Sequence, residues 1–538
     1  MSSDDRDTMP TDIRGYHRRT KHAPNRYAMG PGFLDWTSQP SPFRLFEGVT
    51  QTPLPLVDET PAFPGPAPRP AALDLRALGL FLELSFGVSA WKSYEGSTWA
   101  LRNNPSSGNL HPTECYVLLD AVEGLGTGAG LYHYAPMLHA LEERAAYTAE
   151  RILPEGGFLL ALSSIAWREA WKYGERAFRY CQLDAGHAIG AVAQGAAALG
   201  WRAEALAEPS DAEIAALAGL DRDDAWHRRE SEHPDLLMWI STAAAAAPAP
   251  EIDLFPLIDA PRAFRGRANR LSEDHDGWPV IDLAGQFCRK PRQPTRPLPT
   301  RAQWPAPSFE GVSIGAAVRK RRSAQKMDGT TSMSREAFAA LIASTLPGES
   351  NLLSAFPWPT SVTLILFVHR VDGLEPGLYA LQRDSDVAAR LRAASRKDFE
   401  WALVELDGLP LYRLYAGSVE KEATKLACLQ PISGKGCFSV AMIADFDRAL
   451  EQDGPFAYRR LHFEAGLIGQ AFYLWATAAG IAGTGIGCFF DDTVHELLGL
   501  PPGDMQFQDI YHFTVGGPVE DTRILTLPPY PDDRRERR

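Results

Sequence analysis

Two stretches of the chain carry one pattern: Arg179-Tyr180-Cys181-Gln182-Leu183-Asp184-Ala185-Gly186 and Arg459-Arg460-Leu461-His462-Phe463-Glu464-Ala465-Gly466. The same shift of 280 positions aligns residues 156–220 with 436–500 without a gap, and it keeps an arginine, an acidic residue and an Ala-Gly pair in register. Self-similarity over this length indicates that one structural unit occurs twice. Both copies continue as long apolar runs rich in Ala and Gly, which predicts a buried helix in each.

A second alignment covers the upstream part of the repeat. A shift of 247 positions matches Pro112-Thr113 to Pro359-Thr360, and Gly130-Leu131-Tyr132 to Gly377-Leu378-Tyr379. The difference between the two shifts means that the second copy carries 33 additional residues. We place this insertion near 393–436.

Each copy is expected to fold as the same α+β unit, because helical and strand periodicities follow one another in the same order. The expected helices lie at 73–86 and 335–345, 179–199 and 459–479, and 211–218 and 491–498, and the expected strands at 116–119 and 362–368, 130–132 and 377–379, 158–163 and 438–443, and 236–240 and 510–515.

Composition divides the 538 residues into four parts. We expect an N-terminal arm at 1–50, a first domain at 51–243, a linker at 244–308 and a second domain at 309–538. The linker is rich in Ala, Pro and Arg, which suits a segment that wraps the surface. The arm holds the basic run Tyr16–His22, and with no acidic or cysteine partner nearby it is expected to dock on the rest of the protein rather than to bind a metal.

Bulk properties exclude several function classes. A net charge of −13 and a pI near 5.5 argue against a nucleic-acid partner. The six cysteines show no Cys-x-x-Cys spacing, so neither a zinc site nor a disulfide framework is expected. Residues 1–24 lack the apolar core of a secretory signal, which makes the cytoplasm the expected location. Residues 465–490 are uncharged, but their glycines favour a buried helix followed by a loop over a membrane span.

The run Pro105-Ser106-Ser107-Gly108-Asn109-Leu110-His111-Pro112 stands before the buried strand expected at 116–119. Short polar side chains around a flexible glycine can meet a planar heteroaromatic ligand, although a generic loop has a similar composition. The run resembles the flavin-contacting Pro-Ser-Ser-x-Asn-x-x-Pro segment of the FMN-dependent nitroreductase family. On that resemblance the cofactor-binding candidates of the first half are Arg102, Pro105, Ser106, Ser107, Asn109 and His111.

In that family two such units associate through their long helices and bind FMN between them. The resemblance therefore implies two nitroreductase-like domains fused as an intramolecular pseudodimer, which can act as a monomer. The shift of 247 aligns the polar run 105–109 with Leu352-Leu353-Ser354-Ala355-Phe356. The second half therefore lacks the groups that would contact the flavin ring. We expect one FMN per chain, and independently folded repeats remain the alternative.

The second half carries polar groups that the first half lacks. Arg319-Lys320-Arg321-Arg322-Ser323 resembles the family's phosphate signature, and arginine with serine suits a phosphate, although such a run is also typical of a solvated surface. Gly483-Thr484-Gly485-Ile486-Gly487 resembles the loop that approaches the flavin ring. The candidates of this half are Arg321, Arg322, Ser323, Gln325, Gly485, Ile486, Gly487 and Arg523, of which Gln325 departs from the basic residue of the signature.

Lys172-Tyr173 precedes the first long helix and resembles the Lys-Tyr-x-x-Arg region of SagB-type dehydrogenases, the branch that contains azoline oxidases. The resemblance implies that Lys172 and Tyr173 are catalytic and remove a proton from the substrate, as a desolvated lysine can. A structural role, with Lys172 exposed and Tyr173 packed, stays open. Arg179 and Arg459 recur in both copies, so we assign them to structure, beside the acids Asp184 and Glu464.

The expected activity is an FMN-dependent oxidoreductase that takes a hydride from a small-molecule or peptide-derived substrate. NAD(P)H and O2 are the candidate co-substrates. Two alternatives remain from the residues: an NAD(P)H-dependent reductase of nitro or quinone compounds, and a non-catalytic binding protein on the same fold. No metal site, membrane or nucleic acid is expected.

Overall fold

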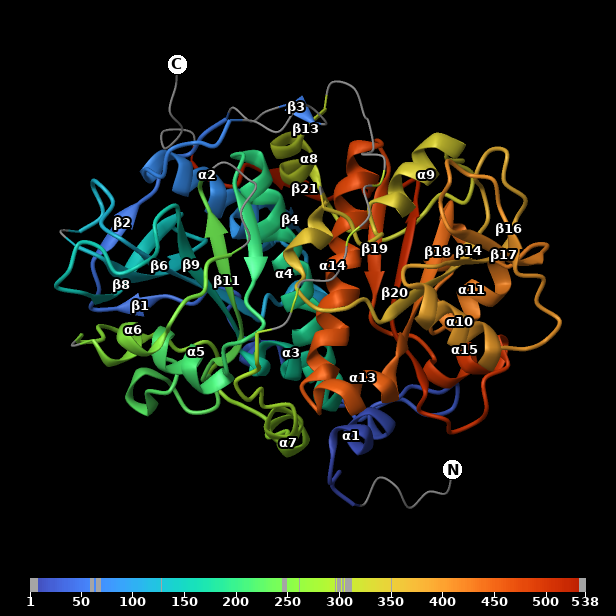
Figure 1. Cartoon of the computed structure of the whole chain (residues 1–538), viewed down its shortest axis with the longest axis horizontal. Coiled ribbons are helices and arrows are strands. Elements are labelled where there is room, and N and C mark those ends of the chain that lie inside the picture. The colour runs from blue at the N-terminus through green and yellow to red at the C-terminus, as the bar shows by residue number, and fades with distance from the viewer. Residues whose placement is uncertain are drawn as a thin grey trace.

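The computed structural model describes residues 8–531 except 59–61, 64–68, 127, 244–248, 261, 296, 298–300, 302–303, 305–311 and 350. The start of the expected arm and parts of the expected linker therefore lie outside the described residues. Two halves of mixed helix and sheet lie side by side, blue to green and yellow to red in Figure 1. Two long helices separate their sheets.

Each half contains a seven-stranded antiparallel sheet. In spatial order the first sheet consists of β10 (Arg202–Ala205), β11 (His233–Ser241), β9 (Gly157–Ser164), β6 (Thr113–Leu119), β7 (Gly130–Ala135), β8 (Ala140–Ala146) and β2 (Gln51–Pro53). The second consists of β19 (Ala482–Ile486), β20 (Phe507–Gly516), β18 (Phe438–Asp445), β14 (Val362–Val368), β15 (Gly377–Leu381), β17 (Leu411–Ala416) and β16 (Ala402–Leu403). The central strands read as continuous apolar runs because apolar side chains of helices pack on both faces of each sheet.

The shared strand order also shows where the second half is longer. A short turn joins β7 to β8, whereas α10 (Ser385–Ala394) and β16 lie between the equivalent strands β15 and β17. Further helices, α11 (Glu420–Leu426) and α12 (Pro431–Lys435), separate β17 from β18. The additional residues thus form two segments that flank β17, and the first begins before position 393.

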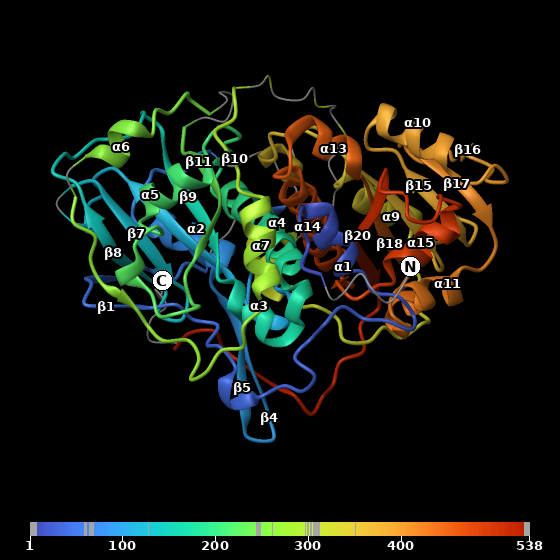
Figure 2. The same cartoon turned by 90° about the horizontal axis from the view of Figure 1, so that it is seen from below.

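The two long helices, α4 (Ala177–Ala198) and α14 (Ala457–Ala478), pack against each other between the sheets (Figures 1 and 2). They cross at Gly186 and Gly466, where an added Cβ on either residue would come 2.9 Å from the other's Cα. This approach requires residues without side chains, which explains the Ala-Gly pair kept in both copies. Helix α2 (Leu75–Phe86) packs on α4, and α9 (Arg335–Ala343) packs on α14.

The short helices α5 (Asp211–Ala218) and α15 (Asp491–Leu498) occupy the predicted ranges. Ser210 and Glu213 form a capping box at the start of α5, and Gly219 ends it in the left-handed conformation. Gly499 ends α15 in the same way, with φ 73°. A left-handed glycine therefore ends the helix at the same place in both halves.

Terminal segments cross between the halves. The basic helix α1 (Ile13–Arg19) pairs with both: Arg14 binds Asp447, and Arg19 binds Glu175. Near the other terminus, β21 (Leu525–Leu527) adds to the hairpin of β4 (Val88–Tyr94) and β5 (Ser97–Arg102), which projects from the first half (Figure 2).

The connection between the halves is partly ordered into elements. It contains α6 (Phe255–Asp259), β12 (Arg267–Ala268), which pairs with β1 (Phe46–Glu47), and α7 (Pro279–Phe287), which packs against α1 and α4. The remaining described elements include α8 (Ile314–Lys320), which precedes the basic cluster, and α13 (Phe446–Asp453), which precedes α14.

The glycine segment expected as a loop after the second long helix begins as a strand. Gly483 and Gly485 belong to β19, which pairs along β20 at the edge of the sheet. Glycines weaken a strand, but here β20 supplies the pairing partner and neighbouring side chains approach too closely for larger residues. Among the described residues, no helix has both the length and the apolar character needed to cross a bilayer.

Candidate functional site

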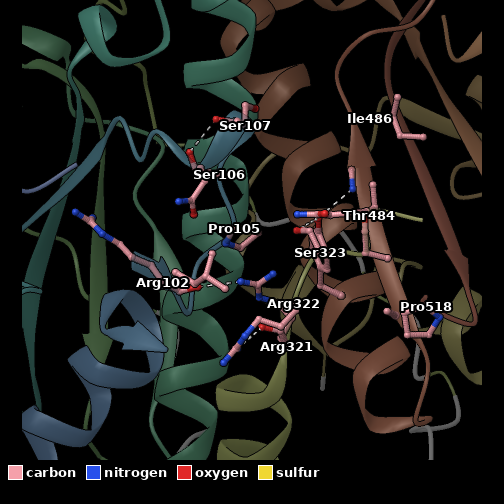
Figure 3. A pocket seen from close by; sticks show the side chains of 18 of the residues that line it. Arg102, Pro105, Ser106, Ser107, Arg321, Arg322, Ser323, Thr484, Ile486 and Pro518 are labelled. Atoms are coloured by element: carbon pink, nitrogen blue, oxygen red, sulfur yellow. Dashed lines mark hydrogen bonds between the residues drawn. The ribbon is translucent and has the colours of Figure 1, made fainter. Parts of the chain in front are cut away.

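A cavity of about 800 Å³ lies between the halves and is lined by both. The first half contributes Asn104–Asn109 and His111, and the second contributes Lys320–Gln325 and the strand β19. Asn109 and Ser323, which lie far apart in sequence, therefore line one site. Figure 3 shows Ser106 and Ser107 on one side of it and Ser323, Thr484 and Ile486 on the other.

The first-half wall is a loop with an unusual backbone. Its residues Gly108, Asn109 and His111 have φ values of 60°, 61° and 52°, which are uncommon for residues other than glycine. Local hydrogen bonds hold this shape: Asn109 Nδ2 donates to Ala100 O at 2.8 Å, and His111 N donates to Ser106 Oγ at 2.7 Å. The surrounding structure thus holds this loop in a strained backbone conformation, as is typical of loops that contact a ligand.

His111 is buried beneath this loop. Its Nε2 lies 3.0 Å from Asn109 Oδ1, whereas its Nδ1 has no hydrogen-bond partner among the described residues. Burial and the charges of Arg102 and Arg168 hold the pKa of His111 well below its ordinary value. The imidazole is therefore neutral at physiological pH.

The second-half wall brings two arginines without carboxylate partners. Arg321 donates from Nε to Asn103 O at 3.2 Å and from Nη2 to Arg102 O at 2.9 Å. Its Nη1 is buried and has no acceptor within the described ranges. Arg322 bonds only main-chain carbonyls in the described structure, and burial together with Arg321 lowers its pKa to about 10. Two buried cations with a spare donor are suited to an anion such as phosphate.

Ser323 is held by a side chain that the sequence analysis missed. Tyr473 of α14 lies 2.8 Å from Ser323 Oγ through its hydroxyl, which also accepts a 3.0 Å bond from Gly485 N. A Cβ atom at Gly485 would overlap the hydroxyl of Tyr511, so only glycine fits there. Tyr473 gave no signal in the sequence because an aromatic residue in an apolar helix is usually part of the core.

The remaining candidates of the second half divide into two groups. Gln325, Ile486 and Gly487 line the cavity, as does Pro105 of the first half. Arg523 does not: its guanidinium binds Asp521 at 2.6 Å, and its side chain is 69% exposed. Arg102 contributes its main chain to the wall, whereas its guanidinium donates to the carbonyl of Pro42 and packs over Phe43.

Lys172 and Tyr173 lie at the end of α3 (Ala166–Tyr173), directly behind the loop. A Cβ placed on Gly108 would be 2.5 Å from the Tyr173 hydroxyl and 3.1 Å from Lys172 Nζ. Tyr173 also lines the cavity and packs on Tyr180, with ring centroids 4.6 Å apart. Burial, and then the neighbouring Glu169, raise the pKa of Tyr173 well above its ordinary value, so its hydroxyl keeps its proton.

Two buried acids complete this corner. Asp184 accepts from Ser107 N at 3.1 Å and from Ser107 Oγ at 3.0 Å, and burial raises its pKa to about 7. Glu169 Oε1 lies 3.5 Å from Ser106 Oγ, and its Oε2 has no partner within the described structure. Burial and Asp184 raise the pKa of Glu169 well above its ordinary value. The corner can therefore hold and release protons near neutral pH.

These acids correct one expectation from the sequence. Asp184 does not pair with Arg179; instead Arg176 and Arg179 both bind Asp491 of the other half. The alignment of Asp184 with Glu464 concealed a difference, because Glu464 is neutralised by a buried ion pair with Arg383. The first-half acid, Asp184, forms no such ion pair with any described residue and lines the cavity.

The corresponding position on the second half is filled by apolar packing. There η6 (Leu352–Ala355) replaces the polar loop and packs against α4 and β10. Leu352, Leu353, Ala355 and Phe356 are all buried. The two halves therefore do not carry equivalent sites.

The model of the nitroreductase family matches residues 97–227 and 318–517, one segment in each half. The chain belongs to the nitroreductase family. This family consists of oxidoreductases that typically use flavin. The match also identifies both α+β units as nitroreductase-like domains. No curated protein sequence matches the chain.

One solved structure has the same fold over nearly the whole chain, and others are similar over part of it. A chain from Anabaena variabilis assigned as a nitroreductase superposes with a TM-score of 0.67 at 21% identity, covering 95% of this chain and 100% of its own. One from Ralstonia eutropha has a TM-score of 0.28 at 14% identity, covering 43% and 100%. A chain of the E. coli microcin synthetase McbBCD complex with truncated pro-MccB17 bound has a TM-score of 0.25 at 20% identity, covering 43% and 88%.

Proposed function

We propose that the protein is an FMN-dependent dehydrogenase or oxidase of the SagB type that oxidises a small-molecule or peptide-derived substrate. The observation that carries the proposal is the joint cavity. It combines cations without acids from one half, a rigid polar loop from the other, and a Lys-Tyr pair behind that loop.

The donor set fits the phosphate end of FMN. Arg321 and Arg322 supply buried positive charge, and the unpartnered Nη1 of Arg321 is available to a phosphate oxygen. Ser323 adds a hydroxyl that Tyr473 orients. Gln325 supplies no charge, but Lys92 and Lys320 line the same cavity as the two arginines.

The loop residues fit the polar edge of a flavin ring. Ser106, Ser107 and Asn109 are fixed by their own hydrogen bonds, so little conformational entropy would be lost on binding. On the opposite wall, Gly485 and Gly487 line the cavity beside Tyr511 and Tyr180, whose rings occupy the space that glycine side chains would need. FMN supplies the two-electron chemistry when it is bound.

The residues of this chain would manage the proton. Lys172 Nζ and the Tyr173 hydroxyl both lie close to Gly108 of the loop, and Tyr173 lines the cavity, so the lysine amine would accept a proton that the tyrosine relays from the cavity. The raised pKa of Tyr173 favours a relay over a phenolate base. Asp184 and Glu169, joined to the loop through Ser107 and Ser106, extend the chain of proton carriers.

The direct test is the flavin content of the purified full-length chain. We expect the visible spectrum of an oxidised flavin, with one FMN released per chain on denaturation. Two flavins per chain, or a colourless protein that takes up no FMN, would contradict the proposal. Anaerobic addition of NADPH separates the reductase alternative, because rapid bleaching without substrate would favour it over substrate oxidation.

A further inference from the structure

Two cysteines to which the proposed function gives no role meet at the edge of the cavity. Cys428 follows α11 in the second half, and Cys488 follows β19. Two hydrogen bonds join their segments on either side: Phe490 N donates to Leu426 O at 2.8 Å, and Gln430 Nε2 donates to Cys488 O at 3.2 Å. The thiol of Cys428 also forms a hydrogen bond with the sulfur of Cys488.

The backbone holds Cys428 in this position. Cys428 and Leu429 have φ values of 50° and 61°, a conformation that costs energy in residues with a side chain. The hydrogen bonds that flank the turn fix this conformation. Both cysteines are partly exposed, whereas Cys115, Cys181, Cys288 and Cys437 are buried.

The surroundings of Cys488 favour its thiolate. The thiol of Cys428 donates to it, and the ring of His22 also bonds it. His22 Nδ1 accepts from Ala28 N at 2.9 Å, so the neutral ring carries its proton on Nε2 and can donate it to sulfur. The hydrogen bond from Cys428, together with His22 and Arg176, lowers the pKa of Cys488 well below its ordinary value.

We propose that Cys428 and Cys488 form a redox-active dithiol, a modification site at which Cys488 is the attacking thiolate and Cys428 the resolving thiol. The co-reactant is a small disulfide, RSSR. Cys488 attacks one sulfur, so that a mixed disulfide forms and one RS⁻ leaves. Cys428 then gives its proton to that thiolate and attacks the Cys488 sulfur, which closes the intramolecular disulfide and releases the second RS⁻. Two cysteines are oxidised, and one small disulfide is reduced.

The bond would tie together two segments that the cavity depends on. Gly487 and Cys488 line the cavity, and Gln430 lines it from the turn after Cys428. Arg176 Nη2 and the Tyr180 hydroxyl both donate to Gly487 O at 3.1 Å, so the attached wall is already anchored on one side. The disulfide would fix its other side.

Oxidised glutathione tests the proposal on the reduced, full-length protein. We expect the loss of two free thiols, a mass lower by two hydrogens, and one cross-linked peptide pair that contains Cys428 and Cys488. Buried Cys437, whose thiol donates to Thr331 O, is the internal control and should stay reduced. Chain unfolded in guanidinium should lose this selectivity, and equal labelling of all six thiols in the folded protein would overturn the proposal.

Single substitutions separate the two roles. Cys428→Ser should trap one glutathionyl group on Cys488, because the resolving thiol is gone. Cys488→Ser should leave Cys428 unmodified over the same time, since Cys488 is expected to react about tenfold faster. Equal reaction of Cys428 in the second variant, or none of Cys488 in the first, would contradict the assignment. Because the wild-type cross-link needs no variant, misfolding of either one leaves the test intact.

Discussion

Arg179 Nη1 of the first long helix lies 2.7 Å from Asp491 Oδ1, at the start of α15 in the other half. The reverse pair is equivalent: Arg459 Nη1 lies 2.7 Å from Asp211 Oδ2, at the start of α5. Each half thus lends an arginine to the other half's short helix, as in a two-fold interface between identical subunits. Both pairs are buried, and the pattern makes the halves one cooperative unit.

We expect Asp491→Asn to destabilise the protein strongly. It would leave Arg176 and Arg179 buried without a counter-charge, which costs about 3–5 kcal/mol of unfolding free energy. The control is Asp447→Asn at the half-exposed Arg14 pair, where a loss of about 0–1 kcal/mol is expected. Denaturant unfolding measures both, and equal losses would contradict the buried-pair argument.

The carboxylate of Asp491 should also make the protein less stable at acid pH. Burial alone would raise the pKa of Asp491, but the two arginines hold it well below its ordinary value. A depressed pKa contributes stability above the unfolded-state value that is lost as the pH falls toward the folded-state value. Asp491→Asn should therefore unfold with less dependence on pH below about pH 4 than the wild type.

Gly466→Ala tests the crossing of the long helices. The added Cβ would overlap Leu183 O and come 2.9 Å from Gly186 Cα, so both helices would have to move. We expect a loss of about 1–3 kcal/mol, the usual cost of overpacking a core. Gly285→Ala in α7 is the matched control, because nothing lies within 4 Å of its new Cβ. That variant should keep or slightly gain stability, as alanine favours a helix.

The repeat predicted much of the fold. Aligned apolar periods located both long helices, and the repeat also placed α5 and α15 with the bounds that the structure has. The local hairpin of β4 and β5 was missed, and so was its third strand β21, which comes from the far end of the chain. Local sequence carries no information on such a partner.

Those parts of the candidate site that consist of residues adjacent in sequence could be predicted from the sequence. The loop around Asn109 and the cluster around Arg321 line one cavity, as the complementary losses in the two halves predicted. Tyr473 and Glu169 could not be found in this way, because each gains its role from a contact with a distant segment. For Asp184 the repeat misled, since Arg383 neutralises only its counterpart.

Arg321→Gln should weaken cofactor binding without unfolding the chain. Loss of a charged donor costs about 1.5–3 kcal/mol, which corresponds to about a 10- to 100-fold higher dissociation constant for FMN. Arg523→Gln is the control, because that exposed guanidinium binds Asp521 and does not line the cavity. Fluorescence titration with FMN compares them. Equal weakening in both variants would move the phosphate site toward Arg523.

Asp184 should make the stability fall as the pH rises. Burial raises its pKa to about 7, so its contribution is complete below the unfolded-state pKa and is lost as the pH rises through about 7. Asp184→Asn should flatten this decline between about pH 4 and pH 7. Glu155→Gln changes an acid that is 87% exposed and should leave the slope unaltered. The test is to measure the unfolding free energy across this pH range. If Asp184→Asn has the same slope as the wild type, Asp184 does not cause the decline in stability.

Lys172→Ala should abolish turnover while the flavin stays bound, because in the proposed mechanism the amine takes the substrate's proton and does not bind the phosphate. Loss of general-base catalysis typically costs about 10²- to 10⁴-fold in kcat. Tyr173→Phe keeps the ring that packs on Tyr180 and removes only the hydroxyl beside Gly108, so a smaller loss is expected. The flavin-to-chain ratio separates chemistry from binding in both variants. Full turnover by Lys172→Ala with bound flavin would leave this lysine a structural role and direct the search for the base to Asp184.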